Sequence, residues 1–69
     1  MKIKVNGEEK IIELDQENAL LSIALNSMGY KPNTIVVELN GLIINSIKWG
    51  KVKLKEGDYL EIVSIVGGG

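Results

Sequence analysis

Two Asn-Gly dipeptides, at residues 6–7 and 40–41, constrain the fold of this chain more than any other feature of its sequence. A type I′ turn needs positive φ at both central residues, and Asn-Gly between short apolar runs is the strongest local signal for it. Each dipeptide therefore predicts a tight hairpin between two antiparallel strands.

The first hairpin joins residues 1–5 to a second run of alternating apolar and polar residues. Alternation places Ile3 and Val5 on the inner face, with the neighbouring lysines outward. The second strand, from about Glu9 to Leu14, should bury Ile12 and Leu14 on the same principle.

A helix is predicted to follow this hairpin, capped by Asp15 or Asn18 and running to about Met28. Gly29 then stands where a helix often ends on a left-handed residue. Apolar residues recur at helical spacing and form one stripe that can lie on a sheet. The stripe consists of Leu21, Ala24, Leu25 and Met28, widened by Leu20 and Ile23.

The second half of the chain reads as strands separated by turns. Residues 35–39 are apolar enough for a central strand, residues 42–44 form a short strand after the second Asn-Gly, and residues 46–50 form one helical turn around Trp49. Trp49 is expected in the core or against the sheet edge. Glu56 and Asp58 flank Gly57 in a predicted turn with solvated charges, before a last strand from Tyr59 to about Val66.

One helix can cover one face of a small sheet, so the order of elements predicts an α+β roll of the β-grasp kind with a mixed sheet. We expect the chain of 69 residues to consist of one domain, residues 1–66, and a flexible glycine tail, residues 67–69. The chain has no Cys and no His, so the core must be built by its 45% hydrophobic residues alone.

The same composition excludes several classes of function. Without His or Cys the usual nucleophile–base pairs and zinc ligands are missing, and no glycine-rich phosphate-binding motif occurs. We therefore expect no enzyme, no bound metal and no bound cofactor. A net charge of −1 gives no reason to expect nucleic acid or membrane as a partner. We expect a cytoplasmic protein, because no stretch reaches the roughly 18 apolar residues of a membrane span, no signal peptide is present, and the absence of Cys fits a reducing compartment. We also expect the protein to be a monomer when it is alone.

Two surface features remain as candidate binding sites. In the last strand, Glu61 should face water, which places Leu60 and Ile62 in the core and leaves Val63 and Ile65 exposed before the tail. We predict that these two residues and Val66 bind a partner. A set of lysines is expected to be the solvated face of an extended segment or, alternatively, a docking patch for an acidic partner: Lys48, Lys51, Lys53 and Lys55.

The sequence ends on Gly67, Gly68 and Gly69. Such a run is compatible with a frayed terminus. Alternatively, three or four extended residues reach about 10–14 Å and, without Cβ atoms, can thread a channel too narrow for other side chains. The carboxylate at the end is ionised at neutral pH and becomes an acyl donor only after a separate ATP-using enzyme has activated it.

These motifs resemble the ThiS sulfur carriers of thiamine biosynthesis, which have a ubiquitin-like β-grasp fold. The resemblance covers essentially the whole chain. It is most specific in the ending EGDYLEIV…GGG, and next in Leu39-Asn40-Gly41 followed by Trp49.

The resemblance implies that a ubiquitin-activating-like adenylyltransferase, using ATP and Mg²⁺, adenylates the carboxylate of Gly69. Sulfur from a cysteine-derived persulfide then gives a thiocarboxylate, which thiazole synthase accepts. Two alternatives stay open: a carrier like the small subunit of molybdopterin synthase, and a β-grasp interaction module with an inert tail.

Overall fold

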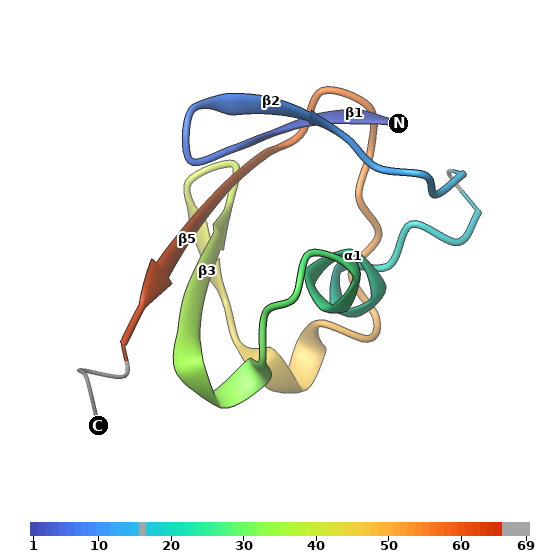
Figure 1. The fold of residues 1–69 in the computed structure, drawn as a ribbon. Coiled ribbons are helices and arrows are strands. Elements are labelled where there is room, and N and C mark those ends of the chain that lie inside the picture. The colour runs from blue at the N-terminus through green and yellow to red at the C-terminus, as the bar shows by residue number, and fades with distance from the viewer. Residues whose placement is uncertain (16, 66–69) are drawn as a thin grey trace.

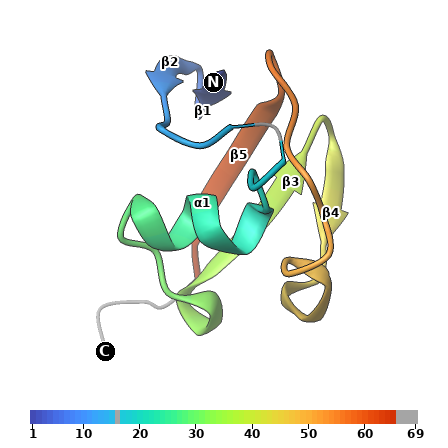
Figure 2. The ribbon, with the colours of Figure 1, turned by 90° about the vertical axis from the view of Figure 1, so that its right-hand side faces the viewer.

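A computed structural model describes residues 1–15 and 17–65 of the chain. In chain order the elements are β1 (Lys2–Val5), β2 (Glu8–Ile11), α1 (Leu21–Ser27), the 3₁₀ turn η1 (Pro32–Thr34), β3 (Ile35–Leu39), β4 (Leu42–Ile44), the 3₁₀ turn η2 (Ser46–Lys48) and β5 (Tyr59–Ser64). The helix α1 lies across one face of the sheet, as Figures 1 and 2 show from two sides.

The sheet has five strands in the order β2-β1-β5-β3-β4, so β5 lies in the middle. β1 and β5 run parallel, and the other neighbouring strands run antiparallel. This mixed sheet with one covering helix confirms the predicted α+β roll of the β-grasp kind.

Both predicted hairpins are present. Asn6 and Asn40 have φ of 53° and 51°, and the glycine after each has φ of 84° and 88°. Asparagine tolerates this left-handed region better than most residues, and glycine enters it freely. The turns therefore close β1 on β2 and β3 on β4.

The second strand is shorter than the sequence predicts. β2 ends at Ile11, and all of its residues are exposed. Ile12 is buried, as expected, but it lies beyond the strand, where its main chain exchanges hydrogen bonds with Met1. Leu14 is half-buried in the segment that follows. The ladder ends at the Met1–Ile12 pair, and the chain then turns toward the helix.

The predicted helix caps are wrong. α1 begins after Leu20, which makes no side-chain cap, and the Asp15 carboxylate instead accepts a hydrogen bond from the Asn18 N–H in a separate turn. Main chain from later in the sequence satisfies the first turn of α1. The N–H of Leu21 donates to the Val52 carbonyl at 2.8 Å, and that of Ser22 to the Trp49 carbonyl at 3.1 Å. These bonds take the place of a cap.

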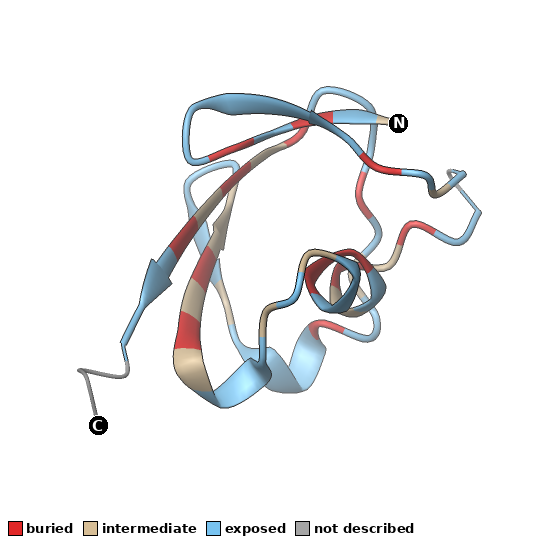
Figure 3. Cartoon of the chain, in the orientation of Figure 1, coloured by how far each residue is buried: buried red, intermediate tan, exposed pale blue. Residues whose placement is uncertain are grey.

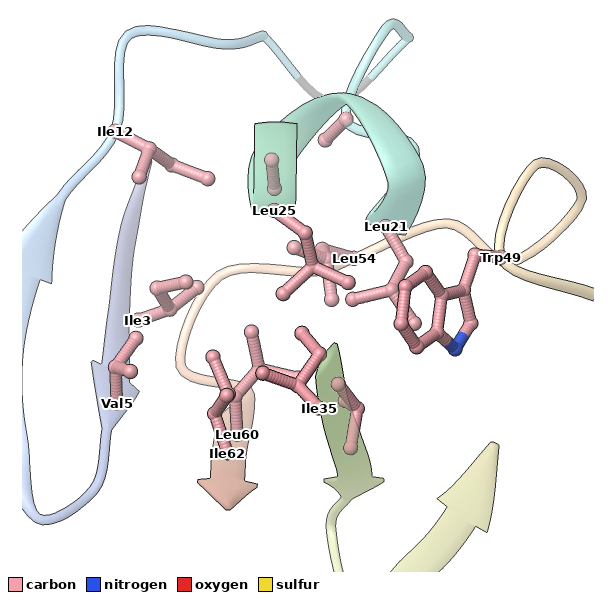
Figure 4. Packing of buried hydrophobic residues seen from close by; sticks show 13 residues of the cluster. Ile3, Val5, Ile12, Leu21, Leu25, Ile35, Trp49, Leu54, Leu60 and Ile62 are labelled. Atoms are coloured by element: carbon pink, nitrogen blue, oxygen red, sulfur yellow. The ribbon is translucent and has the colours of Figure 1, made fainter. Parts of the chain in front are cut away.

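The core lies between α1 and the inner face of the sheet (Figure 4). Leu21, Ala24 and Leu25 form the buried stripe of α1, whereas Ile23 is 43% exposed and does not widen it as predicted. Trp49 is buried, as expected, and its indole N–H donates to the Ile44 carbonyl at 2.9 Å.

The predicted solvated charge at Asp58 is also a misassignment. Asp58 is only 7% exposed, and its carboxylate accepts hydrogen bonds from the Lys55 N–H at 2.7 Å and the Asn40 side-chain amide at 3.0 Å. A buried carboxylate is tolerated where hydrogen bonds replace its hydration. Asp58 therefore ties the turn before β5 to the β3–β4 hairpin.

Substitution of Leu60 by alanine should lower the free energy of unfolding by about 2–5 kcal/mol, because the side chain is fully buried in the central strand. Ile11→Ala is the matched control. Ile11 is 78% exposed on β2, so its loss should cost less than about 0.5 kcal/mol. Urea denaturation of both variants measures the two values, and equal values would contradict this description of the core.

Candidate functional site

The end of β5 presents apolar side chains on the face of the sheet opposite α1. Leu60 and Ile62 point into the core, with exposed fractions of 0% and 7%, while Val63 and Ile65 are 56% and 57% exposed. Figure 3 shows this change from buried to exposed along the strand. The face assignment predicted from the alternation in the sequence therefore agrees with the structure.

Neighbouring strands enlarge this apolar surface. Val36 of β3 lies directly opposite Val63, and Ile43 of β4 lies opposite Glu38, one step along the same face. Ile43 is 70% exposed. We call these four residues the outer apolar patch: Val36, Ile43, Val63 and Ile65. α1 lies on the other side of the sheet (Figure 1), and among the residues described no helix covers the patch.

An open groove of about 330 Å³ adjoins the outer apolar patch. Pro32 of η1 and Trp49 contribute to its walls, together with Val36, Ile43 and Ile65 of the patch. The groove is lined by both polar and apolar groups, including Asn33, Asn45 and Ser46. Its position beside Ile65 allows an apolar side chain of a partner to pack next to the strand that leads into the tail.

Two carboxylates lie next to the patch on the same face. Glu38 stands directly opposite Glu61, and the Tyr59 hydroxyl donates to the Glu61 carboxylate at 2.6 Å. Like charges in directly opposite positions destabilise a strand pair. The hydrogen bond to Glu61, together with desolvation and the negative charge of Glu61, raises the pKa of the Tyr59 phenol above its ordinary value.

The four lysines of residues 48–55 are all exposed, consistent with the solvated face expected for them. Their segment runs beside the start of α1, to which it is joined by the pairing of Leu20 with Lys53. Lys53 thus lies beside the start of α1, whereas Lys48 lies in η2 next to Trp49, which lines the groove.

Four residues of the predicted site, Val66 and Gly67 to Gly69, lie outside the described residues. The residue before them, Ile65, donates its main-chain N–H to the Thr34 carbonyl at 2.9 Å and lines the groove. The outer apolar patch therefore ends at Ile65, one residue before Val66 and two residues before the predicted tail in the sequence.

Neither a metal nor a membrane span is indicated in the part of the chain that the structure describes. No three acidic side chains there come close enough together to hold a metal ion. No helix within those same residues has the length and apolar character needed to span a bilayer.

Comparison with known proteins gives a family match over residues 3–69, nearly the whole sequence and including the glycine tail. The chain belongs to the ThiS family. The resemblance inferred from the sequence motifs is thereby confirmed.

Relatives and solved structures agree with this membership. The ThiS-family chain is 35% identical over its whole length to a thiazole synthase of Magnetococcus marinus and 33% identical to one of Paramagnetospirillum magneticum. It spans 20% of the length of each of these proteins. Its fold matches the crystal structure of the thiamine biosynthesis protein ThiS from Geobacter metallireducens, with a TM-score of 0.82, 24% identity and full coverage of both chains.

Replacement of Glu61 by alanine should lower the pKa of Tyr59 toward its ordinary value, because the substitution removes both the acceptor and the negative charge that favour the protonated phenol. Ultraviolet titration of phenolate in a Tyr30→Phe background reports Tyr59 alone, since the chain has two tyrosines. Glu38→Ala is the control and should change this pKa much less. An equal shift in both variants would mean that the general charge of the face, rather than the hydrogen bond, sets the pKa.

Proposed function

We propose that this ThiS-family chain is a sulfur carrier of thiamine biosynthesis, whose reacting group is the carboxylate of Gly69. The observation that carries the proposal is the family match, which extends through the glycine tail. The protein then acts as a cosubstrate for other enzymes and is not itself a catalyst.

In the proposed reaction a ubiquitin-activating-like adenylyltransferase binds ATP and Mg²⁺, the Gly69 carboxylate attacks the α-phosphorus of ATP, and pyrophosphate leaves as the acyl-adenylate forms. The terminal sulfur of a cysteine-derived persulfide attacks the acyl carbon, and the carbon–oxygen bond to AMP breaks. A thiol then cleaves the sulfur–sulfur bond and releases the thiocarboxylate. The carrier binds no nucleotide or metal itself, and its work beside an ATP-using enzyme fits the cytoplasmic location expected from the sequence.

The outer apolar patch is the proposed docking surface for these partners. Exposed apolar side chains gathered on one face typically mark a protein interface. Here Val63 lies on β5 and Ile65 directly follows its last residue, so a partner that holds the patch also receives the carboxylate. The carrier is expected to be a monomer until it binds such a partner.

Thiazole synthase is the proposed acceptor of the sulfur. Support comes from the two relatives that carry this name and contain a region similar to the whole of this chain. The match to the ThiS family favours this pathway over that of molybdopterin, and it favours a carrier over an interaction module with an inert tail.

Deletion of Gly69 should abolish thiocarboxylate formation, although Gly68 then supplies a new terminal carboxylate. The new group is retracted by about 3.5 Å, one extended residue. A site that needs its reacting atoms within roughly 3–3.5 Å will not tolerate this shift. Mass spectrometry after incubation with ATP, the activating enzyme and a sulfur source detects the exchange of oxygen for sulfur. Normal conversion of the deletion variant would rule out Gly69 as the active end.

Gly68→Val should block the same reaction for a different reason. The carboxylate keeps its reach, but a β-branched side chain must enter a channel proposed to fit glycine alone. The same mass measurement applies, and an unchanged melting temperature shows that the folded domain is intact. Full activity of this variant would argue against a narrow channel.

Val63→Asp and Ile65→Asp should weaken binding to the activating enzyme by about tenfold or more, the loss of roughly 1.4 kcal/mol expected when an apolar contact is replaced by a charge. Both side chains are more than half exposed, so the free energy of unfolding should change by only about 1 kcal/mol or less. Ile11→Asp is the matched control, an exposed isoleucine on the far edge of the sheet. Titration calorimetry and thermal melts separate the two effects. Equal affinity of all three variants for the activating enzyme would show that the patch is not part of the interface.

A further inference from the structure

The support that β1 gives to β5 ends before the outer apolar patch begins. The parallel register pairs Lys4 with Tyr59 and Val5 with Leu60. One more main-chain bond follows, from the Asn6 N–H to the Leu60 carbonyl at 2.9 Å, and the chain then turns away at Gly7.

The side chain of Asn6 extends this ladder by one further step. Its carbonyl oxygen accepts from the Ile62 N–H at 2.7 Å, and its amide nitrogen donates to the Ile62 carbonyl at 3.1 Å. A carboxamide has the same donor and acceptor as a peptide group, so Asn6 substitutes for the main chain of a β1 residue.

Ile62 depends on Asn6 for both main-chain bonds. Two main-chain bonds continue the β3–β5 register at its two ends, from the Asn40 N–H to the Tyr59 carbonyl and from the Ile65 N–H to the Thr34 carbonyl. In this register the odd-numbered residues of β5 bond to β3. In an antiparallel pair the intervening residues point their N–H and C=O groups the other way. The polar groups of Ile62 therefore face β1, where the Asn6 carboxamide satisfies them.

Beyond Ile62, the described part of β5 is paired on one side only. Val63 and Ser64 pair with Val36 and Ile35, and Ile65 bonds to Thr34. Asn6 is thus the last tie from the β1 side before Val63, Ile65 and the tail.

Asn40 provides a natural comparison at the other end of the same strand. It has the same turn conformation as Asn6, and its carboxamide bonds to the Tyr59 N–H at 3.0 Å and to the Asp58 carboxylate at 3.0 Å. Asn40 therefore braces the start of β5, and Asn6 braces its end.

We propose that Asn6 is a positioning residue for the sulfur-carrier reaction: by holding β5 at Ile62 it fixes the point and direction from which the tail leaves the sheet. This inference rests on the proposed function, because it takes Gly69 as the reacting end. Asn6 touches no reacting atom and acts only through β5.

Positioning and stability have different kinetic signatures here, because the carrier is the substrate of the activating enzyme. Partial unfolding lowers the concentration of usable carrier, which raises the apparent KM and leaves kcat unchanged. A folded carrier in which the end of β5 is loosened still docks through Val36 and Ile43. Its carboxylate, however, less often reaches the position in which it can react. That defect lowers kcat, since rate depends steeply on the placement of the reacting atoms.

Asn6→Gly and Asn40→Gly form the matched pair for the test, because glycine accepts the positive φ at both turns and removes the carboxamide from each. Both variants should melt at a lower temperature than the wild type. In ATP-dependent pyrophosphate release with the activating enzyme, Asn6→Gly should lower kcat by about tenfold, whereas Asn40→Gly should leave it within about twofold. Amide hydrogen exchange should show lost protection at Ile62 only in Asn6→Gly.

A second variant allows the same test if Asn6→Gly does not fold. Asn6→Asp keeps the preference for positive φ and an acceptor for the Ile62 N–H, but it places a carboxylate oxygen against the Ile62 carbonyl. It should also lower kcat.

The outcomes separate the two proposals. Unchanged kcat in folded Asn6 variants that have lost protection at Ile62 would overturn the positioning role alone, as would retained protection at Ile62 in Asn6→Gly. If the wild-type carrier itself supports no pyrophosphate release, the proposed function fails, and the positioning role fails with it.

Discussion

The pairing of β5 with strands on both of its sides is the interaction on which the rest of this structure depends. β5 joins β1, from the start of the sequence, to β3, from the middle of the sequence, and Leu60 of β5 is fully buried. Each hairpin turn contributes an asparagine whose carboxamide bonds to β5. The two Asn-Gly turns therefore serve twice, because their main chain closes a hairpin and their side chain fixes the hairpin to the central strand. A chain without disulfides gains cohesion between distant segments in this way.

Features that depend on residues close together in the sequence were predictable from the sequence. Turn chemistry identified both hairpins, alternation assigned the faces of β1 and β5, and helical spacing identified the buried stripe of α1. Contacts between distant segments caused the errors. The main chain of residues 49–52 satisfies the first turn of α1, and Asn40 makes the buried position of Asp58 acceptable. Neither contact leaves a local signal in the sequence.

The same distinction between local and long-range features applies to the candidate site. Val63 and Ile65 followed from the alternation of one strand, whereas Val36 and Ile43 needed the register between strands. That register was within reach, because the Asn40-Gly41 turn sets Leu39 against Leu42, and counting back places Ile43 beside Glu38 on the outer face. The proposed role of Gly69 as the reacting end, and of Gly67 and Gly68 as the part of the tail that threads a channel, rests on the family and on chemistry, since these residues lie outside the described part of the chain.

The composition of the outer face is difficult to explain by stability alone. Apolar side chains at Ile43, Val63 and Ile65 remain more than half exposed, and Glu38 faces Glu61 across a strand pair. Each feature is unfavourable in an isolated domain, because it leaves apolar surface in water or brings like charges together. In the rest of the described chain most apolar residues of the strands and the helix lie in the core, although Ile11, Leu42 and Ile47 are also exposed, and Asp58 has its hydrogen bonds. Such local exceptions in an otherwise consistent fold tend to gather where function requires them. Here Ile43, Val63 and Ile65 share one face of the sheet with the Glu38–Glu61 pair, and this combination marks the face on which we propose that a partner docks.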